Sequence, residues 1–131
     1  MTTQTKKTSI LIVEDEHYLR DLYRDIFKQD GFEVDTAKDG NEAYDKMSHN
    51  KYDLILLDII LPGMDGMQVL DKLAKEKKVT LTNVVLLTNL SQDIVIAKAL
   101  DYGVCGYLIK SDYTPEELLK EARSFLKNNH A

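Results

Sequence analysis

The sequence has little of what would cross-link a chain or anchor it in a membrane. Its 131 residues include one cysteine, Cys105, which excludes an internal disulfide and a zinc site built from several cysteines. No apolar run approaches the about 20 residues that span a bilayer. The polar start, Met1–Lys7, lacks the apolar core of a signal peptide. Because scarce cysteine favours a reducing compartment, we expect a cytoplasmic protein.

Basic residues are outnumbered by acidic ones. The chain has 17 Lys and Arg residues against 22 Asp and Glu residues, a net charge of −5. This balance argues against a general nucleic-acid surface, and we expect neither a nucleic acid nor a membrane as a direct partner. The hydrophobic share of 44% and the charged share of 30% are typical of globular proteins. A chain of this length forms one domain.

Five short segments have the patterns of β-strands. Three are nearly continuous apolar runs, typical of strands covered on both faces of a parallel sheet: Ser9–Val13, Asp53–Leu57 and Asn83–Leu87. Phe32–Ala37 alternates apolar and polar residues, which predicts a half-exposed edge strand. Cys105–Ile109 predicts a fifth strand.

Between these segments the apolar residues recur with the spacing of helices. One stripe covers residues 19–27, with Gly31 placed to end the helix, and another covers 118–126. A further helix is predicted over Ser91–Tyr102, with Gly103 as its stop. Its extra apolar residues indicate a second buried face or a surface for a partner.

Capping residues mark where several helices begin. Thr114, Pro115 and Glu117 have the pattern of a capping box with a proline at the first helical position. The pairs Asp39–Glu42 and Asp65–Gln68 look like further starts. The strand–helix order thus repeats five times, which predicts an α/β fold with a parallel sheet and helices on both faces.

Polar residues directly follow four of the predicted strands. These residues are Glu14 and Asp15, then Asp58, then Thr88, then Lys110. In an open parallel sheet, sites form beyond the carboxyl ends of the strands. Taken singly, each residue has an ordinary explanation as a solvated turn, a cap or a surface side chain. Because all of them are expected at the same edge of the sheet, together they favour a functional site.

The chemistry of these side chains suits a phosphoryl group. Carboxylates crowded at one edge repel each other unless a cation joins them. A solvent-open site lined by acids suits Mg²⁺, which keeps several waters and takes few protein ligands. Lys110 offers a positive charge and Thr88 a hydroxyl donor, so a carboxylate nucleophile would be surrounded by metal, cation and hydroxyl.

Other reactive residues have simpler interpretations. We expect Cys105 to be a small core residue within its strand. The three histidines are expected at the surface: His17, His49 and His130. Tyr107 is open to two interpretations, core packing or a mobile ring near the site.

The combined motifs resemble the receiver domain of two-component response regulators. The resemblance is carried by Glu14-Asp15, Leu56-Leu57-Asp58, the run Leu61-Pro62-Gly63-Met64-Asp65-Gly66, Thr88 and Lys110, in the family's order. It covers essentially the whole chain. It implies a single doubly wound, flavodoxin-like (βα)₅ domain with strand order 2-1-3-4-5, which we place at residues 8–128 between tails at 1–7 and 129–131.

The resemblance also implies the role of each site residue. Asp58 would accept a phosphoryl group from a histidine kinase or a phosphotransfer protein, and Lys110 and Thr88 would contact that group. Tyr107 would be the aromatic switch that follows Thr88. Such a domain catalyses only its own phosphorylation and dephosphorylation, so we do not expect an enzyme in the usual sense. The Mg²⁺ ligands, for which Mn²⁺ could substitute, would be Asp15, Asp58, the backbone carbonyl of Ile60 and, mainly through water, Glu14.

Phosphorylation of such a domain adds a charge of roughly −1.5 to −2 at the rim. By the resemblance, the surface made by the fourth helix, fifth strand and fifth helix would then change and bind an output partner. A dimer that forms on phosphorylation is a further expectation of the same kind.

Four residues depart from the commonest family pattern. Glu14 replaces the more frequent Asp of the acidic pair, a tolerated variant that lengthens the arm toward the metal. Asn89 stands where a very small residue is usual, which predicts narrower access to Asp58. Ser111 replaces the usual proline, so the bond before it is either a non-proline cis peptide costing ~3 kcal/mol or trans. Ile60 is apolar where many members are polar, which predicts a slowly hydrolysing phosphorylated form.

Three other functions fit the sequence less well. A flavodoxin-like nucleotide binder needs a phosphate-cradling loop, but here that loop is acidic, beginning Glu14-Asp15-Glu16. A phosphohydrolase of the haloacid dehalogenase type wants a second acid where Ile60 stands. The remaining alternative is a receiver-like interaction module that is never phosphorylated.

Overall fold

The computed structural model describes residues 7–76, 79–89 and 93–129. Among them, five parallel strands form one sheet in the order β2-β1-β3-β4-β5. The strands are β1 (Ser9–Val13), β2 (Glu33–Ala37), β3 (Leu54–Leu57), β4 (Val84–Thr88) and β5 (Gly106–Ile109). The predicted α/β class, parallel sheet and strand order are confirmed, and β2 lies at the edge as its alternating pattern indicated.

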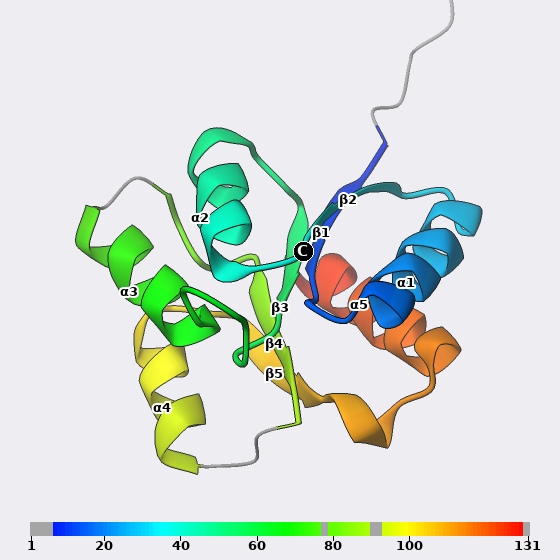
Figure 1. The fold of residues 1–131 in the computed structure, drawn as a ribbon. Coiled ribbons are helices and arrows are strands. Elements are labelled where there is room, and N and C mark those ends of the chain that lie inside the picture. Colours follow the sequence, from blue (N-terminus) through cyan, green and yellow to red (C-terminus); the bar gives the residue numbers. More distant parts are fainter. Residues whose placement is uncertain (1–6, 77–78, 90–92, 130–131) are drawn as a thin grey trace, which may run out of the picture.

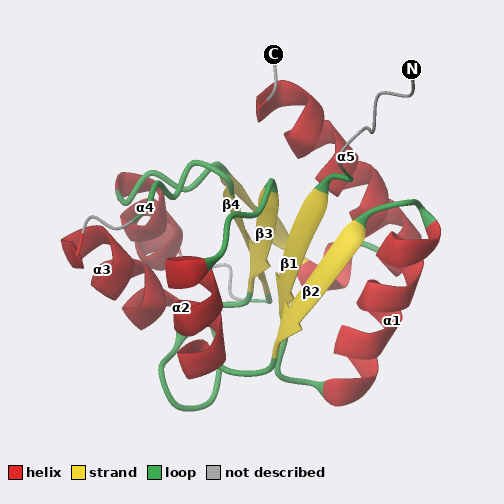
Figure 2. Cartoon of the chain, turned by 90° about the horizontal axis from the view of Figure 1, so that it is seen from above, coloured by secondary structure: helices red, strands yellow, loops and turns green. Residues whose placement is uncertain are grey.

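Helices cover both faces of this sheet (Figures 1 and 2). The helices are α1 (His17–Gln29), α2 (Gly40–His49), α3 (Gly66–Glu76), α4 (Asp93–Asp101) and α5 (Pro115–Asn129), with a short 3₁₀ turn, η1 (Lys110–Asp112), before α5. One hydrophobic core lies between the sheet and α1 with α5, and the other between the sheet and α2, α3 and α4. Within the described ranges, no helix has the length and apolar character needed to cross a membrane.

The predicted helix starts are present. In the capping box before α5, the Thr114 hydroxyl accepts the Glu117 N–H at 3.1 Å and the Glu117 carboxylate accepts the Thr114 N–H at 2.8 Å. Asp65 and Gln68 make the same reciprocal pair before α3. The predicted start of the fourth helix, Ser91, lies outside the described residues.

The strand boundaries differ slightly from those predicted. β2 to β5 each begin one residue later, and the residues before β3 and β4 lie in a bend and a turn. Asp53, for example, uses its carboxylate to accept the Ser9 N–H at 2.8 Å. Cys105 lies just before β5 and is half-buried, so its expected position inside a strand is wrong. β4 extends to Thr88, which pairs with Ile109.

Candidate functional site

Two acidic residues continue the sheet's hydrogen bonding just past the strand ends. The Glu14 N–H donates to the Ala37 carbonyl at 3.0 Å, and the Asp58 N–H donates to the Val13 carbonyl at 3.3 Å. Their backbones are therefore fixed by the sheet although neither residue belongs to a strand. This places both side chains at the carboxyl end of the sheet's centre.

Lys110 joins these two carboxylates. Its Nζ lies 2.7 Å from Asp58 Oδ2 and donates a hydrogen bond to it, and it lies 2.5 Å from Glu14 Oε1. The Glu14 contact is a close ion pair. Glu14 is 1% and Asp58 4% exposed, so these carboxylates are less open to solvent than the sequence indicated. The Lys110 ammonium closes over them.

The three charges alter one another's protonation. Burial raises the pKa of the Glu14 and Asp58 carboxyls above their usual values, against the lowering effect of the Lys110 ammonium. Burial by itself would lower the pKa of Lys110, but the two carboxylates raise it. One ammonium thus balances two buried acids, and the cluster would gain from a second cation.

Asp15 brings a third carboxylate to the same place. One oxygen from each of Glu14, Asp15 and Asp58 lies within 4.8 Å of the others. Asp15 is exposed, and its carboxylate makes no hydrogen bond or ion pair with the part of the chain that the structure describes. Three carboxylates, one of them open to solvent, are the oxygen ligands that Mg²⁺ prefers, so these residues fit that ion.

Sequence comparison assigns the chain to a known family. The sequence model of the response regulator receiver domain family matches residues 10–123. The chain belongs to this receiver domain family. Among relatives, it is 33% identical over 124 residues to the transcriptional regulatory protein ResD of Bacillus subtilis, covering 95% of this chain and 50% of ResD. It is 33% identical over 122 residues to SrrA of Staphylococcus aureus, covering 93% of this chain and 49% of SrrA.

Solved structures agree with this assignment. A CheY-like receiver domain protein from Methanospirillum hungatei superimposes with a TM-score of 0.84 at 26% identity, covering 95% of this chain and 98% of that one. A two-component response regulator from Clostridium difficile gives 0.82 at 30% identity, with 95% and 100% covered. The chain spans about half the length of the curated relatives it matches.

Two further residues of the receiver domain lie on the neighbouring strands β4 and β5. Thr88 is fully buried at the last position of β4, paired with Ile109, the residue before Lys110. Tyr107 lies on β5 and is 44% exposed, so its ring is not part of the packed core. His17 and His49 are exposed as expected, whereas His130 lies outside the described residues.

The loop after Asp58 is packed tightly against it. The Ile60 N–H donates to Asp58 Oδ1 at 3.2 Å, and the Gly66 N–H donates to the Ile59 carbonyl at 2.7 Å. A Cβ at Gly66 would lie 2.4 Å from the Asp58 carbonyl oxygen, so glycine is required for α3 to begin there. Ile60 itself is 59% exposed beside the carboxylate.

Two of the residues that depart from the family pattern, Asn89 and Ser111, contact each other. Asn89 Oδ1 accepts the Ser111 N–H at 3.0 Å, which ties the end of β4 to the turn after β5. The Lys110–Ser111 peptide bond is trans. The sequence did not indicate this contact, because no local pattern relates residues 22 positions apart.

Arg20 also lies at the site, although sequence reasoning passed over it. Its Nη1 donates to the Glu14 carbonyl at 2.9 Å and to the Asp15 carbonyl at 3.2 Å. The available signal was a cation close to the start of α1, where the helix dipole disfavours positive charge.

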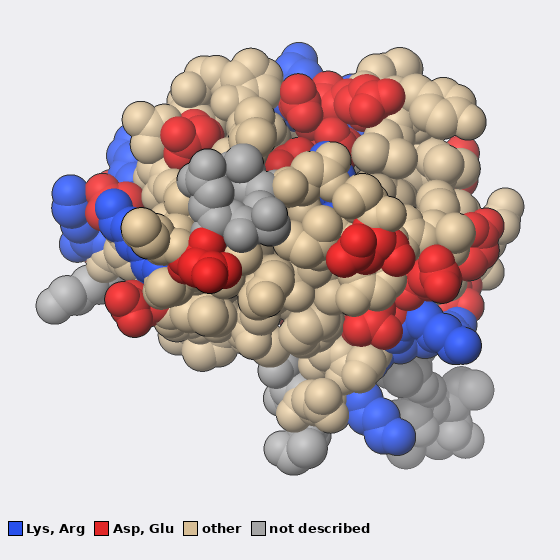
Figure 3. Space-filling model, turned by 90° about the horizontal axis from the view of Figure 1, so that it is seen from below, with Lys and Arg blue, Asp and Glu red and all other residues tan. Residues whose placement is uncertain are grey.

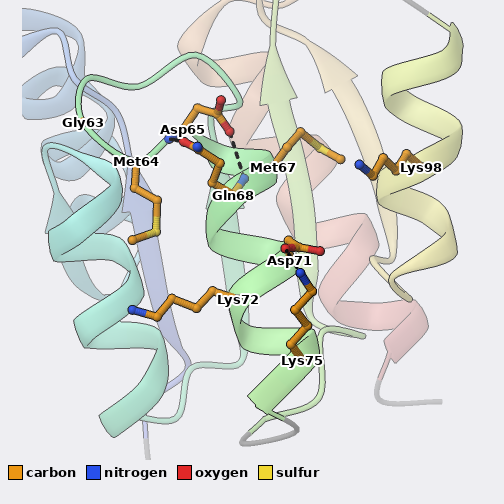
Figure 4. A pocket seen from close by; sticks show the side chains of 9 residues that line it. All are labelled: Gly63, Met64, Asp65, Met67, Gln68, Asp71, Lys72, Lys75 and Lys98. Carbon is orange, nitrogen blue, oxygen red and sulfur yellow. Dashed lines mark hydrogen bonds and ion pairs between the residues drawn. The ribbon is translucent and has the colours of Figure 1, made fainter.

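Other surface features do not compete with the carboxylate cluster. A hollow of about 740 Å³ lies along α3, between the loop after β3 and Lys98 of α4 (Figure 4). Its acids already have partners, since Asp65 caps α3 and Asp71 pairs with Lys75 and accepts the Tyr102 hydroxyl. On the face viewed in Figure 3, acidic side chains predominate and most basic ones lie toward the margins.

Proposed function

We propose that this receiver domain, residues 8–128, accepts a phosphoryl group on Asp58 from a histidine kinase or a phosphotransfer protein in a Mg²⁺-dependent reaction. The observation that carries the proposal is the ammonium of Lys110 shared between the buried carboxylates of Asp58 and Glu14, with Asp15 in the same cluster. A purely structural ion pair would not need the two additional acids, whose mutual repulsion costs stability.

The metal ligands follow from the same cluster. Mg²⁺, or Mn²⁺ in its place, would be held by the Asp15 and Asp58 carboxylates and the Ile60 carbonyl, with Glu14 acting mainly through water. When bound, the ion would offset the charge on the phosphoryl oxygens. Because Lys110 already occupies one oxygen of both Glu14 and Asp58, Asp15 supplies the carboxylate that is open to the ion.

The transfer itself is a single displacement at phosphorus. A carboxylate oxygen of Asp58 forms the new bond, and the bond from phosphorus to the donor nitrogen breaks with its electron pair leaving on that nitrogen. Lys110, 2.7 Å from Asp58, remains beside the new acyl phosphate and balances its charge. Thr88 donates its hydroxyl to a phosphoryl oxygen. The domain catalyses this step and the later hydrolysis of the acyl phosphate, in which water attacks phosphorus and Asp58 leaves as a carboxylate with release of inorganic phosphate, and no other reaction.

Phosphorylation acts on partners through a change in the α4-β5-α5 surface. Movement of Thr88 toward the phosphoryl group opens space for the Tyr107 ring, and the α4-β5-α5 surface then binds a partner or a second phosphorylated copy. Ile94 and Leu100 of α4 are 84% and 44% exposed, so apolar area is ready for that contact. A phosphorylated structure with the Tyr107 ring unmoved would contradict this switch.

The setting of the domain follows from its relatives and composition. ResD and SrrA are named as transcriptional regulatory proteins and are about twice as long as this chain. We therefore propose a cytoplasmic signalling role in which the immediate partners are proteins, with no direct contact to nucleic acid or membrane by this domain.

The test is intact mass spectrometry after incubation with acetyl phosphate or phosphoramidate, with and without Mg²⁺. We expect one phosphoryl adduct that requires the metal and is lost in Asp58→Asn. Asp53→Asn is a matched control, because Asp53 lies on the same segment and caps Ser9 at the opposite end of the sheet; it should still be phosphorylated. Absence of an adduct from both donors and from a phosphorylated histidine phosphotransfer domain would favour an unphosphorylated interaction module.

A further inference from the structure

We infer that Arg20 is a positioning residue for the metal site: it fixes the backbone that carries the acidic pair, so that the Asp15 carboxylate faces Asp58. The inference rests on the proposed function, because it concerns the ion that the reaction needs. Arg20 is on α1 and contacts neither the phosphoacceptor nor any carboxylate of the cluster among the described residues. Its action is therefore through the backbone of Glu14 and Asp15.

The contacts fall where the sheet no longer supports the chain. The last ladder bond of this segment is the Glu14 N–H to the Ala37 carbonyl. Beyond it, the carbonyls of Glu14 and Asp15 both accept from Arg20 Nη1, at 2.9 and 3.2 Å. Past the end of the sheet, the Arg20 guanidinium therefore holds the backbone at Asp15, the residue whose carboxylate must reach the ion.

The position of Arg20 is unfavourable for the helix itself. It is the fourth residue of α1, and the helix dipole disfavours a cation near this end. The first turn contains no acid, and Glu16 makes no side-chain cap. Helix stability therefore gives no reason for an arginine here, whereas the contacts with the loop do.

Arg20 itself occupies no carboxylate oxygen of the acidic pair. Glu14 Oε2 accepts the Glu16 N–H at 3.0 Å, and Glu14 Oε1 faces Lys110. Arg20 takes only carbonyl oxygens, and its Nη2 lies 3.1 Å from His17 Nδ1. Positive charge is thus placed behind the acidic pair without occupying the oxygen atoms that an ion would use.

Arg24 provides a matched control. It lies on the same helix and pairs with Asp21 at 3.1 Å and Asp25 at 3.3 Å, without touching the loop. Loss of either arginine removes one positive charge near a cation site, which by electrostatics alone tightens cation binding. Loss of the backbone contacts at Arg20 acts in the opposite direction, so the two effects differ in sign.

The experiment measures Mn²⁺ binding to the whole chain from the electron paramagnetic resonance signal of free Mn²⁺. For Arg20→Met we expect the Kd to rise about tenfold, as for loss of an outer-shell partner. Arg24→Met should leave the Kd unchanged or lower it slightly. Arg20→Lys, which keeps the charge but has a single nitrogen to donate, should fall between Arg20→Met and the wild type.

Each other outcome contradicts the inference. An unchanged or lower Kd in Arg20→Met would overturn it while leaving the metal site intact, and so would equal weakening by Arg24→Met. If circular dichroism shows that Arg20→Met is unfolded, the Kd of Arg20→Lys is compared with those of the wild type and Arg24→Met instead. A wild-type chain that binds no Mn²⁺ would overturn the proposed metal site itself, and this inference with it.

Discussion

The charge on Lys110 is divided between two acids. Glu14 and Asp58 are nearly inaccessible to water, and removing either partner from such a cluster leaves an unbalanced buried charge. The raised pKa of Lys110 keeps the ammonium charged throughout the neutral range. At the scale of single residues, the ammonium and the two carboxylates are therefore already in contact in the unmodified chain.

The side chain next to Asp58, the proposed phosphoacceptor, should control how long the phosphorylated form lasts. Ile60 is 59% exposed beside Asp58 and offers an attacking water no polar partner. We expect slow hydrolysis, and we expect Ile60→Asn to accelerate it roughly tenfold or more by helping to place the water. The measurement is the loss of the phosphoryl adduct with time after the donor is removed.

Ile94→Asn is the control for this change, since Ile94 is an exposed isoleucine on α4 outside the carboxylate cluster. It should hydrolyse at the wild-type rate. A wild-type half-life of seconds would contradict the prediction, and so would equal acceleration in both variants.

At the scale of elements, local patterns predicted what local forces determine. The capping boxes at Asp65 and Thr114 need only residues three positions apart, and both form. The apolar runs predicted the central strands because both faces of a parallel sheet must be buried. The order of residues after the strands was enough to bring Glu14, Asp58 and Lys110 together.

The remaining features depend on long side chains from distant parts of the fold. Neither the double contact of Lys110 nor the Asn89–Ser111 hydrogen bond has a sequence signal, because each depends on where a side chain points after folding. The burial of Asp58 was missed for the same reason. Arg20 was detectable only as an unfavourable residue at a helix start.

The contact between α3 and the end of β3 can be tested by adding one methyl group. Gly66→Ala would place a Cβ 2.4 Å from the Asp58 carbonyl oxygen, so the helix start or the loop must move. We expect a loss of stability of about 1–3 kcal/mol by overpacking, together with slower phosphorylation of Asp58. Urea unfolding and adduct formation with acetyl phosphate measure the two effects.

Gly103→Ala separates backbone strain from this displacement. Gly103 has a φ of +98° and nothing within 4 Å of an added Cβ, so alanine there strains the turn without a clash. It should lower stability while leaving the phosphorylation rate unchanged. A normal phosphorylation rate in Gly66→Ala would show that the packing of α3 does not set the position of Asp58.

At the scale of the whole molecule, stability should depend on an ion pair that joins three segments at the sheet's edge. Asp35 of β2 lies 2.8 Å from Lys46 Nζ and accepts the Tyr52 hydroxyl at 2.7 Å. Burial alone would raise the pKa of Asp35, but these two partners lower it below its usual 3.8. The pair therefore stabilises the fold above that pH, and its contribution disappears as the pH falls through the lowered pKa.

Asp35→Asn should reduce the free energy of unfolding at pH 7 by less than about 1 kcal/mol, because the pair is partly exposed. The difference from the wild type should shrink below about pH 4, where the unfolded carboxylate takes up its proton. Urea unfolding at both pH values tests this. Glu33→Gln, at an exposed position of the same strand, should show no such pH-dependent difference; a matching effect there would assign the result to net charge.

The bridging position of Lys110 also bears on how a resting receiver should be represented in binding studies. Asp58→Asn removes the proposed phosphoacceptor, but it also removes one of the two carboxylates that hold the ammonium. Lys110 is then left with Glu14 alone, and the charge of the rim changes by one unit before any signal arrives. The Asp58→Asn variant therefore alters the unphosphorylated state and does not reproduce it. The unsubstituted chain, kept free of phosphoryl donors, is the proper reference when partners are compared.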